Sequence, residues 1–278
     1  MDNREMLETF GFSWNRLIIP KNIPNHPDKT IEYVFKKAMY DFVYDASVAE
    51  DNPLTFVEVK TVMDGFTVGG HKLSDQAQII NLQKACNELL NKISDNSFSL
   101  TKEDFCLFNN LIAFEESLEW GHFRGEGEEV NLTPHVSLGE LGRHTPIKTE
   151  KDAPLLNNHF KKAVSNLNGF DNSIEKSLVF FLYGALQQFF FDGNKRSSRF
   201  MMNGILMSNN TYPISVPAKS VHEYNEKMVK FYKDRNADEM ISFLINCHPE
   251  AEAIKKLNSS NLTKSKSKYD RSDSGLES

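Results

Sequence analysis

The sequence predicts an all-α protein with one short β-hairpin, and three observations support that prediction. Apolar residues recur at the three-to-four-residue spacing of an amphipathic helix through long stretches such as 31–50 and 74–93. Residues 173–190 are apolar nearly all round, as in a helix buried within a protein core. Glycine and proline gather in residues 121–152, where a helix cannot continue and a hairpin fits.

In the first third of the chain, the helix expected over residues 31–50 ends before Pro53. The residue preceding a proline is disfavoured in the helical conformation, so the proline marks a boundary. Thr55 can cap the next helix, and Glu58 three positions later completes a capping box. A longer amphipathic helix is expected over residues 74–93.

Thr101 begins the next expected helix, which runs to about Trp120. The glycine-rich segment follows, and a short hairpin between residues 130–133 and 135–138 is expected within it. Helical patterning then resumes over residues 154–167.

The buried helix over residues 173–190 leads into a turn at Gly193, from which a further helix begins. Two more helices are expected near residues 218–233 and 237–247. From residue 254 the composition changes to Lys, Ser, Asn, Asp and Thr without apolar periodicity. Such a segment cannot bury enough apolar surface to fold, so a disordered tail is expected there.

The chain is therefore expected to have three parts. Residues 1–95 form an N-terminal helical region, residues 96–253 form the core, and residues 254–278 form the tail. With 278 residues, 40% of them hydrophobic, the chain can bury a substantial core. Its net charge of −6 gives no general attraction to nucleic acid or to an anionic membrane, so neither is expected as a partner.

The three cysteines, Cys86, Cys106 and Cys247, show no metal-ligand spacing and are expected to be reduced, packed thiols. No signal peptide and no apolar run of membrane-spanning length is recognised in the sequence. We therefore expect a cytoplasmic protein, and the sequence leaves its oligomeric state open.

Residues 188–199 read Gln-Phe-Phe-Phe-Asp-Gly-Asn-Lys-Arg-Ser-Ser-Arg and join two predicted helices. A glycine turn at the start of a helix aims backbone N–H groups and the positive end of the helix dipole at one point, which suits a bound phosphate. Taken singly, Asp-Gly-Asn is an ordinary turn and the two arginines are ordinary surface charges. Their combination between two apolar helices favours a nucleotide site.

This stretch resembles the signature of the Fic family, His-Pro-Phe-x-Asp/Glu-Gly-Asn-Gly/Lys-Arg-x-x-Arg. Seven positions are in register: Phe190, Asp192, Gly193, Asn194, Lys195, Arg196 and Arg199. Gln188 stands where the family has its catalytic histidine. The resemblance extends over about residues 31–247.

The resemblance implies a Fic-fold helical bundle with a β-hairpin flap, and protein adenylylation, the transfer of AMP from ATP to a target hydroxyl. It implies that Asp192 holds Mg²⁺ and that an unknown target protein docks at the flap, about residues 130–145. The remaining site residues implied by the resemblance contact the phosphates of the nucleotide: Gly193, Asn194, Lys195, Arg196 and Arg199.

Gln188 has no basic lone pair near neutral pH, so it cannot serve as the general base of this reaction. Two alternatives therefore stay open: an inactive nucleotide-sensing or protein-interaction module, and transfer of another phosphate-containing group with a different base. The histidines considered for that base are His122, His135, His144 and His159.

Residues 46–52, at the end of the helix assigned to residues 31–52, resemble the inhibitory helix of many Fic proteins, which reads Ser/Thr-x-x-x-Glu-Gly/Asn. Glu50 occupies the glutamate position, whereas Ala46 and Asp51 depart from the pattern. The resemblance implies an inhibitory ion pair between Glu50 and Arg199. The alternative is that Glu50 is a solvated residue near a helix end.

Overall fold

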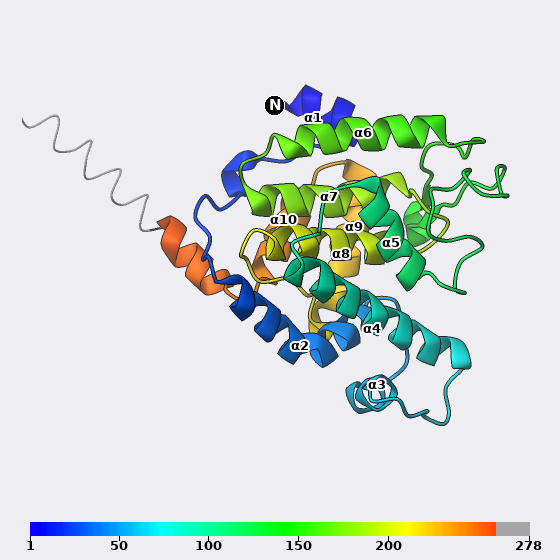
Figure 1. Cartoon of the computed structure of the whole chain (residues 1–278). Coiled ribbons are helices and arrows are strands. Elements are labelled where there is room, and N and C mark those ends of the chain that lie inside the picture. The colour runs from blue at the N-terminus through cyan, green and yellow to red at the C-terminus, as the bar shows by residue number, and fades with distance from the viewer. Residues whose placement is uncertain (260–278) are drawn as a thin grey trace, which may run out of the picture.

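The computed structural model describes residues 1–259, which form a bundle of helices with one two-stranded antiparallel sheet (Figure 1). The helices are α1 (Asn3–Phe10), α2 (Asp28–Val48), α3 (Phe56–Met63), α4 (Leu73–Ser94), α5 (Lys102–Ile112), α6 (Pro154–Asn168), α7 (Ser173–Gln187), α8 (Asn194–Met207), α9 (Val221–Asp234), α10 (Asp238–Asn246) and a last one over residues 251–259. The strands are β1 (Val136–Ser137) and β2 (Arg143–His144). The predicted fold class, all-α with a short hairpin, is confirmed.

Helices α7 and α8 form the centre of the bundle, and the side chains of both are buried along almost their whole length. Figure 1 shows α6 on one side of this pair and α2 and α4 on the other, with α5 packed directly on α8. The two central helices approach closely where Gly184 of α7 faces Ser198 of α8. The motif predicted from the sequence lies in the loop that joins them.

Phenylalanine rings hold this loop against the core. Phe189 and Phe190 are fully buried, and their ring centroids lie 5.7 and 4.8 Å from that of Phe105 on α5. Phe123 lies 4.7 Å from Phe189. Stacked and edge-on aromatic contacts of this kind add stability beyond the area that they bury.

The segment before α2 is part of the core although it lies outside the predicted resemblance. Trp14 is buried and its indole Nε1–H donates a 2.9 Å hydrogen bond to Glu175 at the start of α7. Arg16 donates to both oxygens of the same carboxylate, at 2.6 Å. A buried carboxylate requires such partners, and they attach the N-terminal segment to the central helix.

Two helix ends differ from the prediction. The helix that begins after Thr101 ends at Ile112, and not near Trp120, because Glu115 adopts a left-handed conformation and the chain turns back toward the core. The helix that begins at Ser173 ends at Gln187, and not at Phe190, because Gln188 is itself left-handed with a φ of 51°. After Gln187 the apolar run continues beyond the helix because Phe189 and Phe190 pack inward from the loop.

The predicted hairpin partners were also wrong. Residues 136–137 pair with residues 143–144 across a turn that contains Gly139 and Gly142, both at positive φ. The expected partner strand, residues 130–133, is not available, because the Glu129 carboxylate accepts the N–H groups of Asn131 and Leu132.

The first residues of the predicted tail, 254–259, are helical and not disordered. Residues 251–259 are helical, with Ile254 1% exposed and Asn258 accepting the backbone N–H groups of Lys21 and Asn22. The remaining residues of the predicted tail, 260–278, lie outside the described part of the chain. Within that part, no helix combines the length and the hydropathy that crossing a bilayer requires.

The close approach of α7 and α8 generates a testable prediction. A Cβ atom added at Gly184 would lie 2.1 Å from Oγ and 3.1 Å from Cβ of Ser198, so Gly184→Ala must displace the Ser198 side chain or separate the central helices. We expect a loss of about 1–3 kcal/mol in the free energy of unfolding, measured by urea denaturation. The control is Gly69→Ala, where no atom lies within 4 Å of an added Cβ; an equal loss in both variants would contradict the packing argument.

Candidate functional site

The site is built on the loop between α7 and α8. Gln188 ends α7 in a left-handed conformation, and Gly193 caps α8 with a φ of 74°. Glycine suits that position because it adopts a positive φ without steric cost. The N–H groups of Asn194, Lys195 and Arg196 lie in the first turn of α8, where no carbonyl of the helix can pair with them. The predicted anion cradle requires unpaired N–H groups at this helix start, and the geometry of α8 is compatible with that requirement.

The side chain of Gln188 holds the loop together. It is only 7% exposed; its Nε2 donates to the carbonyl of Ala185 at 2.6 Å, and its Oε1 accepts from Nδ2 of Asn194 at 3.1 Å. Both ends of the amide are therefore engaged inside the protein. At the position where the family has its catalytic histidine, this chain has a structural side chain.

Asn194 closes the same loop from the other side. Its Oδ1 accepts the backbone N–H of Phe190 at 2.9 Å, while its Nδ2 donates to the carbonyl of Phe190 at 2.9 Å and to Gln188. Because both polar atoms of the Asn194 side chain form hydrogen bonds within the loop, the predicted contact of this residue with a phosphate would have to come from its backbone N–H.

Asn109 of α5, which the sequence analysis did not select, supports the turn from below. This side chain is fully buried; its Nδ2 donates to the carbonyl of Asp192 at 3.0 Å, and its Oδ1 accepts the N–H of Gly121 at 3.0 Å. It thereby fixes the loop to the glycine-rich segment.

Arg124 makes a second link between these segments. It is fully buried and donates to the carbonyl of Gln188 at 2.7 Å, to Oγ1 of Thr149 at 2.7 Å and to the carbonyl of Ile147 at 2.6 Å. Burial lowers the pKa of Arg124 to about 10, so the guanidinium remains charged at neutral pH. One arginine thus joins the start of the loop to the base of the hairpin.

The basic residues of the loop converge on Glu50. Nη2 of Arg199 donates to Oε1 of Glu50 at 2.7 Å, and Lys195 and Arg196 lie 3.8 Å from the same carboxylate. The predicted ion pair between Glu50 and Arg199 is present, and the alternative of a solvated Glu50 is wrong: its side chain is 15% exposed. Burial alone would raise the pKa of Glu50, but the three cations outweigh burial and lower it.

A second carboxylate, Glu116, holds Arg196. The distance from Nη1 of Arg196 to Oε2 of Glu116 is 2.6 Å, and Glu116 also accepts hydrogen bonds from Gln78 and Asn81 of α4. Burial acts to lower the pKa of Arg196, but Glu50 and Glu116 raise it above its ordinary value. Both arginines of the motif are therefore occupied by carboxylates of the protein itself.

Asp192 is the exposed member of the loop, with its side chain 59% accessible. One carboxylate oxygen accepts the N–H of Gly193 at 2.6 Å, and the other lies 3.7 Å from Arg196. No group of three or more acidic, histidine or cysteine side chains in residues 1–259 is arranged to hold a metal. A single carboxylate fits Mg²⁺ in sites where phosphates and water supply most of the ligands.

The four histidines considered as replacement bases do not converge on the loop. His135 and His159 are exposed, His159 on α6 and His135 just before β1. His122 is half-buried beside the segment that contacts the loop, with Nδ1 3.3 Å from the carbonyl of Phe123. His144 is buried, and both of its ring nitrogens are engaged.

His144 attaches the hairpin to the body of the protein. Its Nε2 donates to the carbonyl of Leu186 at 2.7 Å, and its Nδ1 accepts from Arg235 at 2.9 Å. The ring also stacks on Tyr232 of α9 at a centroid distance of 5.2 Å. Burial lowers the pKa of His144, the Leu186 hydrogen bond opposes that shift, and Arg235 reinforces it.

No spacing in the sequence marks Asn109, Glu116 or Arg124, because each reaches the loop across a long stretch of chain. The sequence offers one indication, and it concerns Arg124 alone. This basic residue stands near Gly121 at the start of the glycine-rich segment and has no acidic residue directly beside it in the sequence.

Comparisons with known proteins find Fic proteins similar to this chain in sequence and in fold. No protein-family model matches the chain. The protein adenylyltransferase Fic of Aedes aegypti is 21% identical over 215 residues, covering 76% of this chain and 40% of that protein. The Drosophila grimshawi protein of the same name is 22% identical over 221 residues, covering 76% and 42%. The chain thus spans about two fifths of the length of these curated relatives.

Solved structures of Fic proteins share the fold. Fic-1 from C. elegans superposes with a TM-score of 0.63 at 17% identity, covering 94% of this chain and 73% of that chain. A Fic domain-containing signaling protein from Bacteroides thetaiotaomicron gives 0.62 at 17% identity, covering 92% and 91%. The chain has a Fic fold, and sequence and fold together support a Fic-domain protein.

The environment of His144 predicts how stability depends on pH. Because its pKa is depressed in the folded state, folding favours the neutral ring; that contribution is complete above the unfolded value near 6.5 and is lost as pH falls below it. We expect the native chain to lose more stability than His144→Gln between pH 7 and pH 5, measured by urea denaturation. Identical pH profiles would show that the imidazole does not contribute in this way.

Proposed function

We propose that this chain binds a nucleoside triphosphate, with ATP the expected one, at the loop from Asp192 to Arg199. The observation that supports it best is the convergence of Lys195, Arg196 and Arg199 on one buried carboxylate beside a free helix N-terminus. Guanidinium groups bind phosphate oxygens through paired hydrogen bonds, and the N–H groups of the first helical turn add to that attraction.

In the resting protein, Glu50 and Glu116 take the place of the phosphates. A carboxylate and a phosphate use the same donors of an arginine, so each carboxylate must release its arginine before the triphosphate can bind. We therefore infer a brake with two parts: Glu50 from the end of α2 occupies Arg199, and Glu116 from the segment after α5 occupies Arg196.

Asp192 would hold Mg²⁺ in this site, through the carboxylate that the loop leaves exposed. The metal would neutralise charge on the phosphates. The chain itself contributes the N–H groups of α8, which bind and orient phosphate oxygens, and the two arginines, which stabilise charge.

The inherited reaction is adenylylation of a protein hydroxyl, and the chain lacks the base that this reaction normally uses. A second candidate, an inactive nucleotide-sensing or protein-interaction module, is favoured by the hydrogen bonds that engage both ends of the Gln188 amide. Transfer with a different base has less support, because His144 is held by Leu186 and Arg235 and two other histidines are exposed.

Restoring the base distinguishes the two candidates. We expect Gln188→His combined with Glu50→Gly to label proteins of a lysate with radioactive AMP about 10²–10⁴-fold faster than Glu50→Gly alone, because a positioned base contributes that much to the rate. Adding Asp192→Ala to the active variant should abolish the labelling. Equal labelling with glutamine and histidine would mean that the native chain transfers AMP with another base.

Removing the brake should strengthen nucleotide binding. We expect Glu50→Gln and Glu116→Gln each to tighten binding of a non-hydrolysable ATP analogue, and the double variant to tighten it by about tenfold or more, measured by isothermal titration calorimetry. Because each change removes one carboxylate from a cluster that contains two buried arginines, the variants should unfold at lower temperature without nucleotide and regain stability when it is added.

The control is Asp41→Asn, which removes one exposed negative charge from the same helix as the inhibitory segment. It should leave the affinity unchanged. If neither carboxylate variant tightens binding, the two-part brake is wrong. If Arg196→Ala combined with Arg199→Ala leaves the affinity unchanged, the phosphate assignment itself is wrong.

A further inference from the structure

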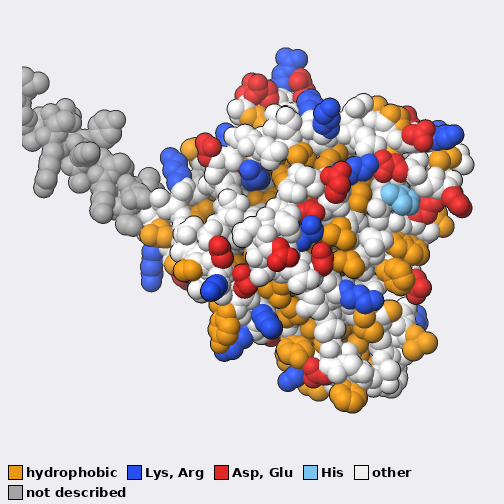
Figure 2. Space-filling model, in the orientation of Figure 1, with side chains coloured by type: hydrophobic (Ala, Val, Ile, Leu, Met, Phe, Trp, Pro, Cys, Tyr) orange, Lys and Arg blue, Asp and Glu red, His pale blue; other side chains and the backbone are white. Residues whose placement is uncertain are grey.

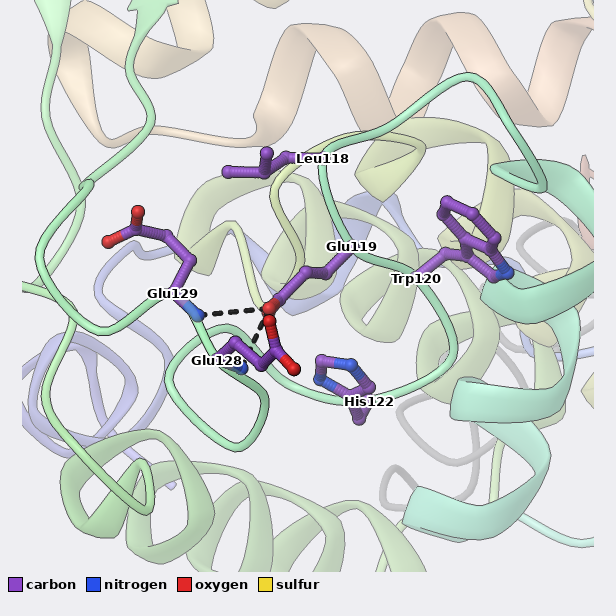
Figure 3. A pocket seen from close by; sticks show the side chains of 6 residues that line it. All are labelled: Leu118, Glu119, Trp120, His122, Glu128 and Glu129. Atoms are coloured by element: carbon purple, nitrogen blue, oxygen red, sulfur yellow. Dashed lines mark hydrogen bonds between the residues drawn. The ribbon is translucent and has the colours of Figure 1, made fainter.

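A cleft of about 570 Å³ lies between the residues that follow α5 and the segment that leads into the hairpin (Figure 3). Six residues line it: Leu118, Glu119, Trp120, His122, Glu128 and Glu129. The arginines of the motif do not line this cleft; Arg196 and Arg199 border a narrow crevice between α2 and α8. The proposed nucleotide site therefore does not account for this cleft.

Glu119 gives the cleft a fixed shape. Its Oε1 accepts the backbone N–H groups of Glu128 at 2.7 Å and Glu129 at 2.9 Å, the two contacts drawn in Figure 3. Its Oε2 is buried and has no hydrogen-bond partner. Gly127 permits this approach, since a Cβ there would lie 2.5 Å from Oε2 of Glu119 and 2.6 Å from Cε1 of His122.

The cleft carries negative charge that the protein does not neutralise. Within residues 1–259, none of Glu119, Glu128 and Glu129 forms an ion pair with a lysine, arginine or histidine. Hydrogen bonds from the N–H groups of Leu132 and Asn131 hold the pKa of Glu129 below its ordinary value, so it is ionised at neutral pH. Three carboxylates repel a phosphate group, and they are not arranged to share one metal ion.

The lining also offers apolar surface. Leu118 is 59% exposed, and Trp120 is half-buried with its ring against Phe114 at a centroid distance of 5.5 Å. In Figure 2 hydrophobic side chains gather on the part of the face near the end of α5. Carboxylates beside an indole and a leucine suit a lysine or arginine side chain, whose aliphatic stem packs while its cationic head meets the carboxylates and the ring.

Backbone hydrogen bonds connect the segment around His122, which lines the cleft, to the motif loop. The N–H of Arg124 donates to the carbonyl of Phe189 at 2.9 Å, and the N–H of Gly121 reaches Asn109, which holds the carbonyl of Asp192. His122 lies between these two anchors. The segment that carries His122, one of the residues lining the cleft, is thus fixed to the motif loop on both sides.

We propose that the cleft binds a lysine or arginine side chain of the target protein, close in its sequence to the hydroxyl presented to the loop. The proposal rests on the proposed function for the role of that target, and it names the class of substrate: a basic segment. Glu128 and Glu129 contact the cation, while Glu119 positions both through their backbone N–H groups.

Binding of defined peptides tests the proposal without nucleotide. The probes are two fluorescein-labelled peptides of eleven residues with a central serine and either two lysines or two norleucines on each side. Norleucine keeps the aliphatic stem and removes the charge. We expect the lysine peptide to bind at least about tenfold more tightly by fluorescence anisotropy, and binding to weaken with added salt.

Matched variants show where the peptide binds. We expect Glu128→Gln with Glu129→Gln to weaken binding of the lysine peptide by about tenfold, and Glu223→Gln with Glu226→Gln on α9, an equal change in charge, to alter it less than about twofold. The unlabelled lysine peptide should change the fluorescence of Trp120, because the only other tryptophan, Trp14, is 2% exposed.

Three results would overturn the proposal: equal affinity for the two peptides, equal loss in both double variants, or no binding of the lysine peptide at millimolar concentration. Because nucleotide is absent from this assay, such a failure leaves the proposed ATP site untouched. Conversely, loss of the ATP site alone would not alter peptide binding.

Discussion

The structure depends on the requirement that buried charges have partners. Arg196 and Arg199 are 4% and 6% exposed, and removing their charges from water would cost several kcal/mol each without nearby carboxylates. Glu50 and Glu116 supply those carboxylates from two segments far apart in the chain. The ion cluster therefore fixes how the end of α2 and the segment after α5 sit against α8.

Local patterns predicted much of the fold, and long-range polar contacts explain what they missed. Helical periodicity located α2, α4 and α7, and the capping box at Thr55 and Glu58 is present as expected. The strand partners of the hairpin depended on Glu129, whose carboxylate takes the N–H groups of the expected strand. Within the site, the contact of Glu50 with Arg199 followed from a family resemblance. No motif or resemblance indicated the contact of Glu116 with Arg196.

Gln188 separates two properties that usually occur together in a Fic site. The amide supplies a donor for Ala185 and an acceptor for Asn194, so the loop keeps its shape without a group that titrates near neutral pH. The side chain at this position is an amide, which does not act as a general base near neutral pH, and the first N–H groups of α8 follow it in the same loop.

Arg124 has a consequence for how the hairpin can move. No carboxylate pairs with this guanidinium in residues 1–259; its charge is compensated by two carbonyls and one hydroxyl, two of these oxygens at the hairpin base and one at Gln188. If the hairpin moved away alone, a cation would be stranded in an apolar interior. Through these three hydrogen bonds Arg124 couples the base of the hairpin to Gln188, so a displacement of the hairpin base is expected to be felt at the residue with which the motif begins.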